Sequence, residues 1–238
     1  MARDREMRRE SDTLGEILVP AHRYWGAQTQ RSKDNFPIGD EKMNVEVIHA
    51  LGHIKRAAAT VHGRLGLMDE EVATAIVRAA TEVARGELDD HFPLVVYQTG
   101  SGTQINMNAN EVIANRANEI LGTRPGTRSP VHPNDHVNRS QSSNDVFPTA
   151  MHLAAVSALE KQLRPSLSHL HHLLEQKSER WQEVVKIGRT HLMDATPLTL
   201  GQEFSGYATQ VHNGLERISS CMERLSMVPM GGTAVGTG

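Results

Sequence analysis

The stretch VHPNDHVNRSQSSNDVFPTAMHLAA, residues 131–155, changes character in its middle. As far as Asn144 it is crowded with short polar side chains, and from Asp145 it follows an apolar helical pattern. The change predicts a polar loop that leads into the N-terminus of a helix. The first turn of a helix exposes unpaired backbone N–H groups and a partial positive charge, so such a place receives anions.

The same residues allow a purely structural interpretation. Ser142, Ser143 and Asn144 before a helix are typical of an N-cap with spare polar neighbours, and Pro148 suits a first helical turn. On this stretch alone, the cap and the anion site both stay open.

Composition limits the class of protein. The 238 residues are enough for one large or two ordinary domains, and with 4% aromatic residues the core must be built from aliphatic side chains. A net charge of -3 gives no reason to expect a nucleic acid or a membrane surface as partner.

The lone Cys221 excludes an internal disulfide and favours a reducing compartment, and we expect the cytoplasm. No run approaches the ~20 apolar residues of a membrane helix, and residues 1–12 are expected to be a solvated tail.

The periodicity of apolar residues predicts a mainly α protein. A short strand is indicated over residues 15–20, and helices over residues 44–65 and 70–85 and from soon after Ser101 to Leu121. Three longer helices follow, over residues 145–163, from Pro165 onward, and over residues 200–225. We predict an N-terminal α-rich domain, residues 1–140, followed by the first part of a long-helix bundle, residues 141–238. Bundles of this kind commonly oligomerise.

A second polar loop, TGSGT at residues 99–103, precedes one of these helices. It lacks the spacing of a nucleotide-binding loop, so a nucleotide site is not expected. It offers neutral donors without a nearby carboxylate, a set that fits a small carboxylate ligand better than a metal. These donors are Ser101, Thr103, Asn106, Asn108 and Asn110.

A third polar segment separates the second and third long helices, and we expect Arg189, Thr190 and His191 to lie in a loop there. A loop histidine with a pKa near neutrality can be a general acid or base, and it can equally cap a helix. Elsewhere, His169, His171 and His172 have too few acids or cysteines at ligand spacing, so we interpret them as surface or interface histidines. We expect no metal and no cofactor.

Four segments in order carry a resemblance to a known family. WGAQTQRS, TGSGT, HPND followed by SQSSND, and GRTHLMDATPLTLGQEFSGY resemble the class II fumarases of the fumarase/aspartase superfamily. The resemblance implies a lyase of the tricarboxylic acid cycle that hydrates fumarate reversibly to (S)-malate. It further implies a homotetramer whose active sites each take residues from three subunits.

The family's functional residues carry over by motif. His191 takes the acid/base role and Thr190 a substrate contact. The dicarboxylate at the main site would be bound by Ser101, Gly102, Thr103, Ser142, Ser143 and Asn144. An accessory dicarboxylate site would correspond to His132, Pro133, Asn134 and Asp135. The arginine expected three residues before that histidine is Ser129 here, with Arg128 adjacent.

The resemblance extends over about the first half of a typical family member. A later loop with a catalytic serine has no counterpart in these 238 residues, so we expect little or no activity from them alone. Aspartate ammonia-lyase is an alternative because it shares TGSGT, HPNDHVN and the THL block, although SQSSND in place of GQSTND favours a hydratase. A non-catalytic, oligomerising helical fragment is a further alternative.

Overall fold

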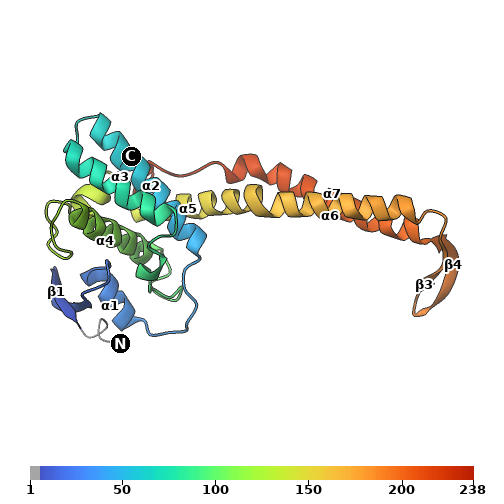
Figure 1. Cartoon of the computed structure of the whole chain (residues 1–238), viewed down its shortest axis with the longest axis horizontal. Coiled ribbons are helices and arrows are strands. Elements are labelled where there is room, and N and C mark those ends of the chain that lie inside the picture. Colours follow the sequence, from blue (N-terminus) through green and yellow to red (C-terminus); the bar gives the residue numbers. More distant parts are fainter. Residues whose placement is uncertain (1–5) are drawn as a thin grey trace. The chain divides into compact units, whose positions relative to one another are not determined.

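The computed structural model describes residues 6–238 and is mainly α-helical, as the sequence predicts (Figure 1). The chain forms two compact units. The first consists of Met1–Ala154 together with Val228–Gly238, and the second of Ala155–Met227. The division into residues 1–140 and 141–238 stays a prediction.

The first unit begins with an antiparallel hairpin of β1 (Met7–Asp12) and β2 (Gly15–Pro20). The predicted strand at residues 15–20 is confirmed, whereas the predicted solvated tail is wrong from Met7 onward; residues 1–5 lie outside the described part. The charged residues of β1 made it look solvated, but two of them form an inward ion pair. Arg8 Nη2 lies 2.5 Å from Glu10 Oε1, and Arg8 also donates to the Trp25 carbonyl at 2.6 Å.

The next helix, α1 (Ala27–Asn35), has no side-chain cap at its own N-cap residue, Gly26. The buried Glu111 carboxylate takes that role from a different helix. It accepts backbone N–H groups from Gly26 at 2.9 Å, Gln28 at 2.8 Å and Thr29 at 3.1 Å, and the Thr29 hydroxyl at 2.6 Å. A carboxylate at this end also complements the positive end of the helix dipole.

Helices α2 (Val45–Arg64) and α3 (Glu70–Ala84) pack against each other. Asp69 caps α3 as predicted, with its Oδ1 2.9 Å from Glu71 N. Gly52 allows the close approach of the two helices, because a Cβ there would lie 2.6 Å from the backbone nitrogen of Ala84.

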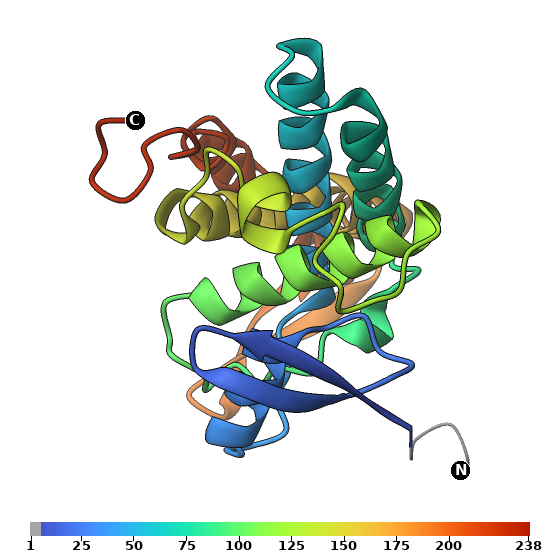
Figure 2. The same cartoon turned by 90° about the vertical axis from the view of Figure 1, so that its left-hand side faces the viewer.

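Helix α4 (Thr103–Ile120) crosses this pair and is buried along most of its length (Figure 2). Its buried asparagines bind the backbone of surrounding segments. Asn108 donates to the His91 carbonyl at 3.1 Å, in η2 (Asp89–His91), and Asn115 donates to that of Tyr24 at 2.7 Å. Asn118 exchanges two hydrogen bonds with the backbone of Val131, at 2.8 and 2.9 Å. Helix α4 therefore fixes the loops around it as well as the core.

A single turn, η3 (Pro133–Val137), leads to α5 (Ser143–Ala158). The chain's last residues also belong to this unit, because Gly231 N and Thr233 N donate to Asp145 Oδ2 at 2.9 and 3.1 Å. Asp145 is buried at the start of α5. It ties a segment that is 86 residues away in sequence to this helix start.

The second unit contains η4 (Leu159–Leu163), α6 (Arg164–Arg180), β3 (Val185–Thr190), β4 (Met193–Thr199) and α7 (Leu200–Leu225). Helices α6 and α7 lie alongside each other (Figure 1). The helix expected from Pro165 onward is confirmed, since α6 begins at Arg164 with Pro165 in its first turn, and Ala158, Leu163 and Arg164 keep right-handed helical backbone angles before it.

The apolar seam of α7 is confirmed as a helix face, and most of its side chains are half-buried. Only Gly201 and Ala208 of this helix are buried among the described residues. Trp181 packs edge-to-face on Phe204, with ring centroids 4.9 Å apart, and Phe204 on Tyr207 at 5.7 Å. No helix in the described part of the chain is both long and apolar enough to cross a membrane.

We predict that Glu111→Ala destabilises the protein by about 3 kcal/mol, because it leaves three backbone donors at the start of α1 without their acceptor. Glu70→Ala, at an exposed carboxylate in the first turn of α3, is the control and should cost about 0.5 kcal/mol. Urea unfolding measures both free energies. Equal losses in the two variants would contradict the capping role of Glu111.

Candidate active site

Two helix N-termini meet in the first unit. Helix α4 begins at Thr103, after Gly102 in the left-handed conformation with φ of 76°, and no side chain caps it. Helix α5 begins at Ser143. The hydroxyl oxygens of Thr103 and Ser143 lie 3.1 Å apart and join the two helix starts. The positive ends of two helix dipoles therefore lie at one place.

The TGSGT loop extends this contact into a chain of hydroxyls. Ser101 Oγ donates to Thr103 Oγ1 at 3.1 Å, and Thr99 Oγ1 lies 3.4 Å from Ser101 Oγ. Ser101 is exposed, whereas Thr103 and Ser143 are half-buried. A ligand can thus reach donors that the protein holds in place, a suitable arrangement for a carboxylate.

Gly102 is required at its position for two reasons. Its φ is unfavourable for other residues, and a Cβ there would lie 2.2 Å from the ring of Phe147. Phe147 lies one turn into α5. The ring thus packs directly on the backbone of the TGSGT loop and sets the distance between the two helix starts.

The SSND segment closes the start of α5 with its own groups. Ser142 N donates to Asp145 Oδ1 at 3.2 Å, and Asn144 N donates to Ser142 Oγ at 3.3 Å. Asn144 is exposed, and its side-chain amide lies 3.5 Å from the carbonyl oxygen of Ala234. The residues that cap α5 and the predicted binding residues therefore belong to one segment. A helix cap and an anion site at this stretch are compatible.

The structure brings a residue to this segment that the sequence analysis missed. Lys55 of α2 is fully buried, and its Nζ donates to Asn138 Oδ1 at 2.9 Å and to Gln141 Oε1 at 3.0 Å. Burial lowers the pKa of Lys55 to about 7, and the Asp145 carboxylate opposes that shift. The available signal was the spacing of Ile48, Leu51 and Lys55, which places a lysine on the apolar face of a helix.

The asparagines expected beside Ser101 and Thr103 have a different place. Asn106, Asn108 and Asn110 are buried within α4. Asn106 donates to Asn138 Oδ1 at 3.2 Å, and Asn110 contacts the sulfur of Met107 at 3.5 Å. Because α4 begins at Thr103, these three residues lie within the helix and not in the loop before it. Their amide nitrogens contact protein groups in the interior of the first unit.

The residues of the predicted accessory site form η3 and its cap. His132 Nδ1 accepts the backbone N–H groups of Asn134 at 3.3 Å and Asp135 at 3.2 Å. Asn134 and Asp135 are exposed, whereas Pro133 is buried. The pKa of Asp12 in β1 is lowered mainly by a hydrogen bond from Arg31, with a smaller contribution from the charge of Arg128. The charge of Arg128 therefore acts on β1. In the sequence, Arg128 is one residue before Ser129, the position where the resemblance leads us to expect an arginine.

His191 and Thr190 belong to the second unit. The predicted loop is wrong, because β3 and β4 pair up to Thr190 and Met193 and leave a two-residue turn of His191 and Leu192. Both turn residues have positive φ, 51° and 62°, as a tight hairpin requires. His191 is exposed and does not cap α7, since Thr199 with Gln202 provides that cap. The histidine is therefore presented to its surroundings by a defined turn.

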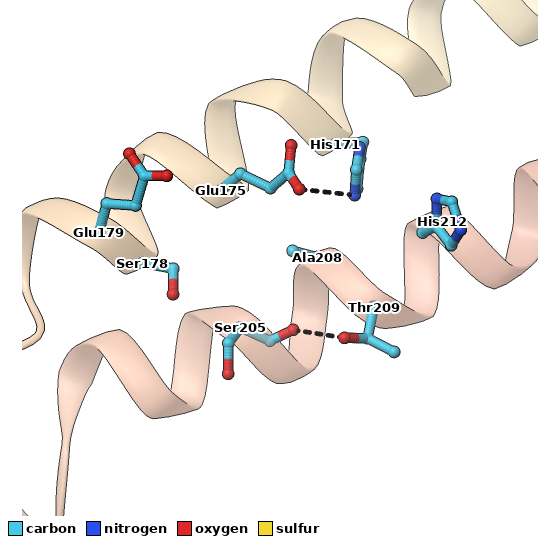
Figure 3. Close-up of a pocket in the computed structure, with 8 residues that line it drawn as sticks. All are labelled: His171, Glu175, Ser178, Glu179, Ser205, Ala208, Thr209 and His212. Carbon is cyan, nitrogen blue, oxygen red and sulfur yellow. Dashed lines mark hydrogen bonds and ion pairs between the residues drawn. The ribbon is translucent and has the colours of Figure 1, made fainter.

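A groove of about 420 Å³ lies between α6 and α7 (Figure 3). His171 and Glu175 form an ion pair at 3.5 Å, and Thr209 Oγ1 donates to the Ser205 carbonyl at 2.9 Å. The rings of His171 and His212 lie 5.3 Å apart. The carboxylates of Glu175 and Glu179 make this groove a poor site for a dicarboxylate, so the helix N-termini of the first unit remain the candidate.

Comparisons with known proteins show which family the chain belongs to. A family model described as a lyase matches residues 15–238. The class II fumarate hydratase 2 of Bradyrhizobium diazoefficiens is 60% identical over 231 residues, which are 97% of this chain and 49% of that protein. The mitochondrial fumarate hydratase of Schizosaccharomyces pombe is 60% identical over 235 residues, which are 98% of this chain and 45% of that protein. The chain thus spans about half the length of the curated relatives that it matches.

Solved structures give the same result. The class II fumarase of Schistosoma mansoni superimposes with a TM-score of 0.93 at 46% identity, over 98% of this chain and 49% of that chain. A fumarate lyase:delta crystallin of Brucella melitensis superimposes with a TM-score of 0.92 at 43% identity, over 98% of this chain and 51% of that chain.

We predict that Gly102→Ala destabilises the first unit by about 2 to 4 kcal/mol, because it combines an unfavourable φ with a clash against Phe147. Gly100→Ala is a matched control, since Gly100 has a φ of 75° but no atom within 4 Å of the added Cβ, and it should cost about 1 kcal/mol. Chemical unfolding compares them. Equal costs would show that the Phe147 ring does not limit this position.

Proposed function

Since the chain belongs to the lyase family, we propose that the protein is a class II fumarate hydratase, which adds water to fumarate to give (S)-malate. The observation that carries the proposal is the contact of Thr103 and Ser143, which joins the N-termini of α4 and α5. A dicarboxylate needs concentrated neutral donors, and two helix starts with their hydroxyls provide them.

In this proposal, one substrate carboxylate is bound by the TGSGT loop through Ser101, Gly102 and Thr103. The SSN segment, Ser142, Ser143 and Asn144, contributes further donors from the start of α5. Negative charge builds on a carboxylate when water adds to the neighbouring double bond. Fixed N–H and O–H donors stabilise that charge without having to reorient, which lowers the barrier.

The proton chemistry is assigned to His191, with Thr190 as a substrate contact. Hydration requires a base that takes a proton from water and an acid that gives a proton to the adjacent carbon. His191 is suited to one of these transfers because an imidazole nitrogen can accept or donate a proton. Its place in a tight, exposed turn presents the ring to a substrate held by other segments.

We further propose that the working protein is a homotetramer, as the family resemblance implies. The seam of α7 supports association, because its apolar side chains are only half-buried and can pack on further helices. His191 would then meet donor segments that another copy supplies.

Residues 132–135 are proposed as an accessory dicarboxylate site. We also propose a cytoplasmic location, with which the exposed free thiol of Cys221 is compatible.

The decisive experiment measures fumarate formation from malate by ultraviolet absorbance, using the full-length protein. His191→Asn should reduce kcat by about 100-fold or more with little change in KM, since it removes a proton carrier. Asparagine tolerates the positive φ of this turn, so the hairpin should persist. The same substitution at the exposed His172 is the control and should leave kcat unchanged.

Aspartate is tested beside malate. Fumarate from aspartate but not from malate would identify an aspartate ammonia-lyase and overturn the hydratase proposal. No turnover of either substrate by the wild-type full-length protein would support the non-catalytic, oligomerising alternative.

A further inference from the structure

Lys55 lies in the middle of α2 and is fully buried. A buried ammonium group costs several kcal/mol unless hydrogen bonds and an opposite charge compensate for it. Methionine would fill similar space at this position without that cost. A lysine at this buried position therefore calls for an explanation beyond packing.

The hydrogen bonds of Lys55 go to one segment. Both acceptors, Asn138 Oδ1 at 2.9 Å and Gln141 Oε1 at 3.0 Å, lie in the few residues before Ser142. The same two side chains then organise that segment. Asn138 Nδ2 donates to the Gln141 carbonyl at 3.1 Å, and Gln141 Nε2 donates to the Val137 carbonyl at 3.0 Å. Lys55 thus holds the turn that delivers the chain to the start of α5.

The network also reaches both helices whose N-termini form the candidate active site. Asn106 of α4 donates to the same Asn138 oxygen at 3.2 Å. Asp145 of α5, whose negative charge acts on Lys55, accepts Ser142 N at 3.2 Å and Gly231 N at 2.9 Å. Lys55 therefore binds the segment between η3 and α5 directly, is linked to α4 through Asn138, and interacts with α5 through the charge of Asp145.

We propose that Lys55 is a positioning residue for dicarboxylate binding, which fixes Ser142, Ser143 and Asn144 against the start of α4 through Asn138 and Gln141. The inference rests on the proposed function of the same site. Lys55 does not touch the substrate. It lowers the cost of ordering the donor segment, so it strengthens substrate binding more than it accelerates the chemical step.

The test compares Lys55→Met with Arg56→Met in the full-length protein. Arg56 is the next residue of α2 and is exposed, so its variant removes a cation of similar length without touching the network. We expect Lys55→Met to raise KM for fumarate and Kd for succinate, an unreactive dicarboxylate probe, by about tenfold. The value of kcat should fall less than about threefold, and Arg56→Met should match the wild type.

Two further measurements keep the test decisive. Hydrogen exchange of the peptide covering residues 138–147 should accelerate in Lys55→Met but not in Arg56→Met. If Lys55→Met does not fold, Gln141→Leu removes one acceptor of Lys55 from a half-buried position and should raise Kd for succinate in the same direction.

The inference fails if Lys55→Met binds succinate as the wild type does, or if kcat falls while KM and Kd stay unchanged. A failure of the proposed function is a different result, in which the wild type itself neither converts fumarate nor binds succinate. Both proposals are then overturned. Wild-type activity together with an indistinguishable Lys55→Met overturns only the role of Lys55.

Discussion

The buried polar face of α4 is the constraint on which the first unit depends. A helix that is buried on most sides would ordinarily present apolar residues all round, but α4 carries asparagines and Glu111 in the core. Each needs hydrogen-bond partners away from water. The backbone of the loops supplies many of them, at Tyr24, Gly26, His91 and Val131. The interior of the unit therefore determines the conformation of its surface segments.

The candidate site follows from this arrangement. Its donors lie on loops, which are normally the mobile part of a fold, but Lys55 of α2 and Asn106 of α4 bind the segment before α5 through Asn138 and Gln141. Phe147 limits how the TGSGT loop can move toward α5, because its ring packs on Gly102. Asp145 connects the start of α5 to the last residues of the chain. Donors fixed in this way can stabilise a charge that develops during a reaction without first reorienting.

The second unit provides a different kind of element. Its hairpin carries few internal contacts beyond the strand pairing, and Leu192 at the turn is 95% exposed. The defined part is the turn itself, where two successive residues hold positive φ. His191 thus has a fixed local geometry and an open environment. Both properties agree with the proton-carrier role proposed for His191.

The sequence by itself determined the helices and the chemistry of the donors. Apolar spacing placed α2, α3 and α7 close to their observed bounds, and Asp69 marked the start of α3, because helix periodicity and capping are local properties. The motifs TGSGT and SQSSND identified the segments that meet at Thr103 and Ser143.

Only the tertiary structure decided which charged and amide groups face inward. The charged residues Arg8 and Glu10 are not typical of a strand, yet they belong to β1. Asn106 and Asn108 are predicted as ligand donors, but they donate to Asn138 and to the His91 carbonyl inside the first unit. Lys55 was overlooked. Each of these side chains also binds a group in another segment, and helix periodicity and local motifs do not show which segments the fold brings together.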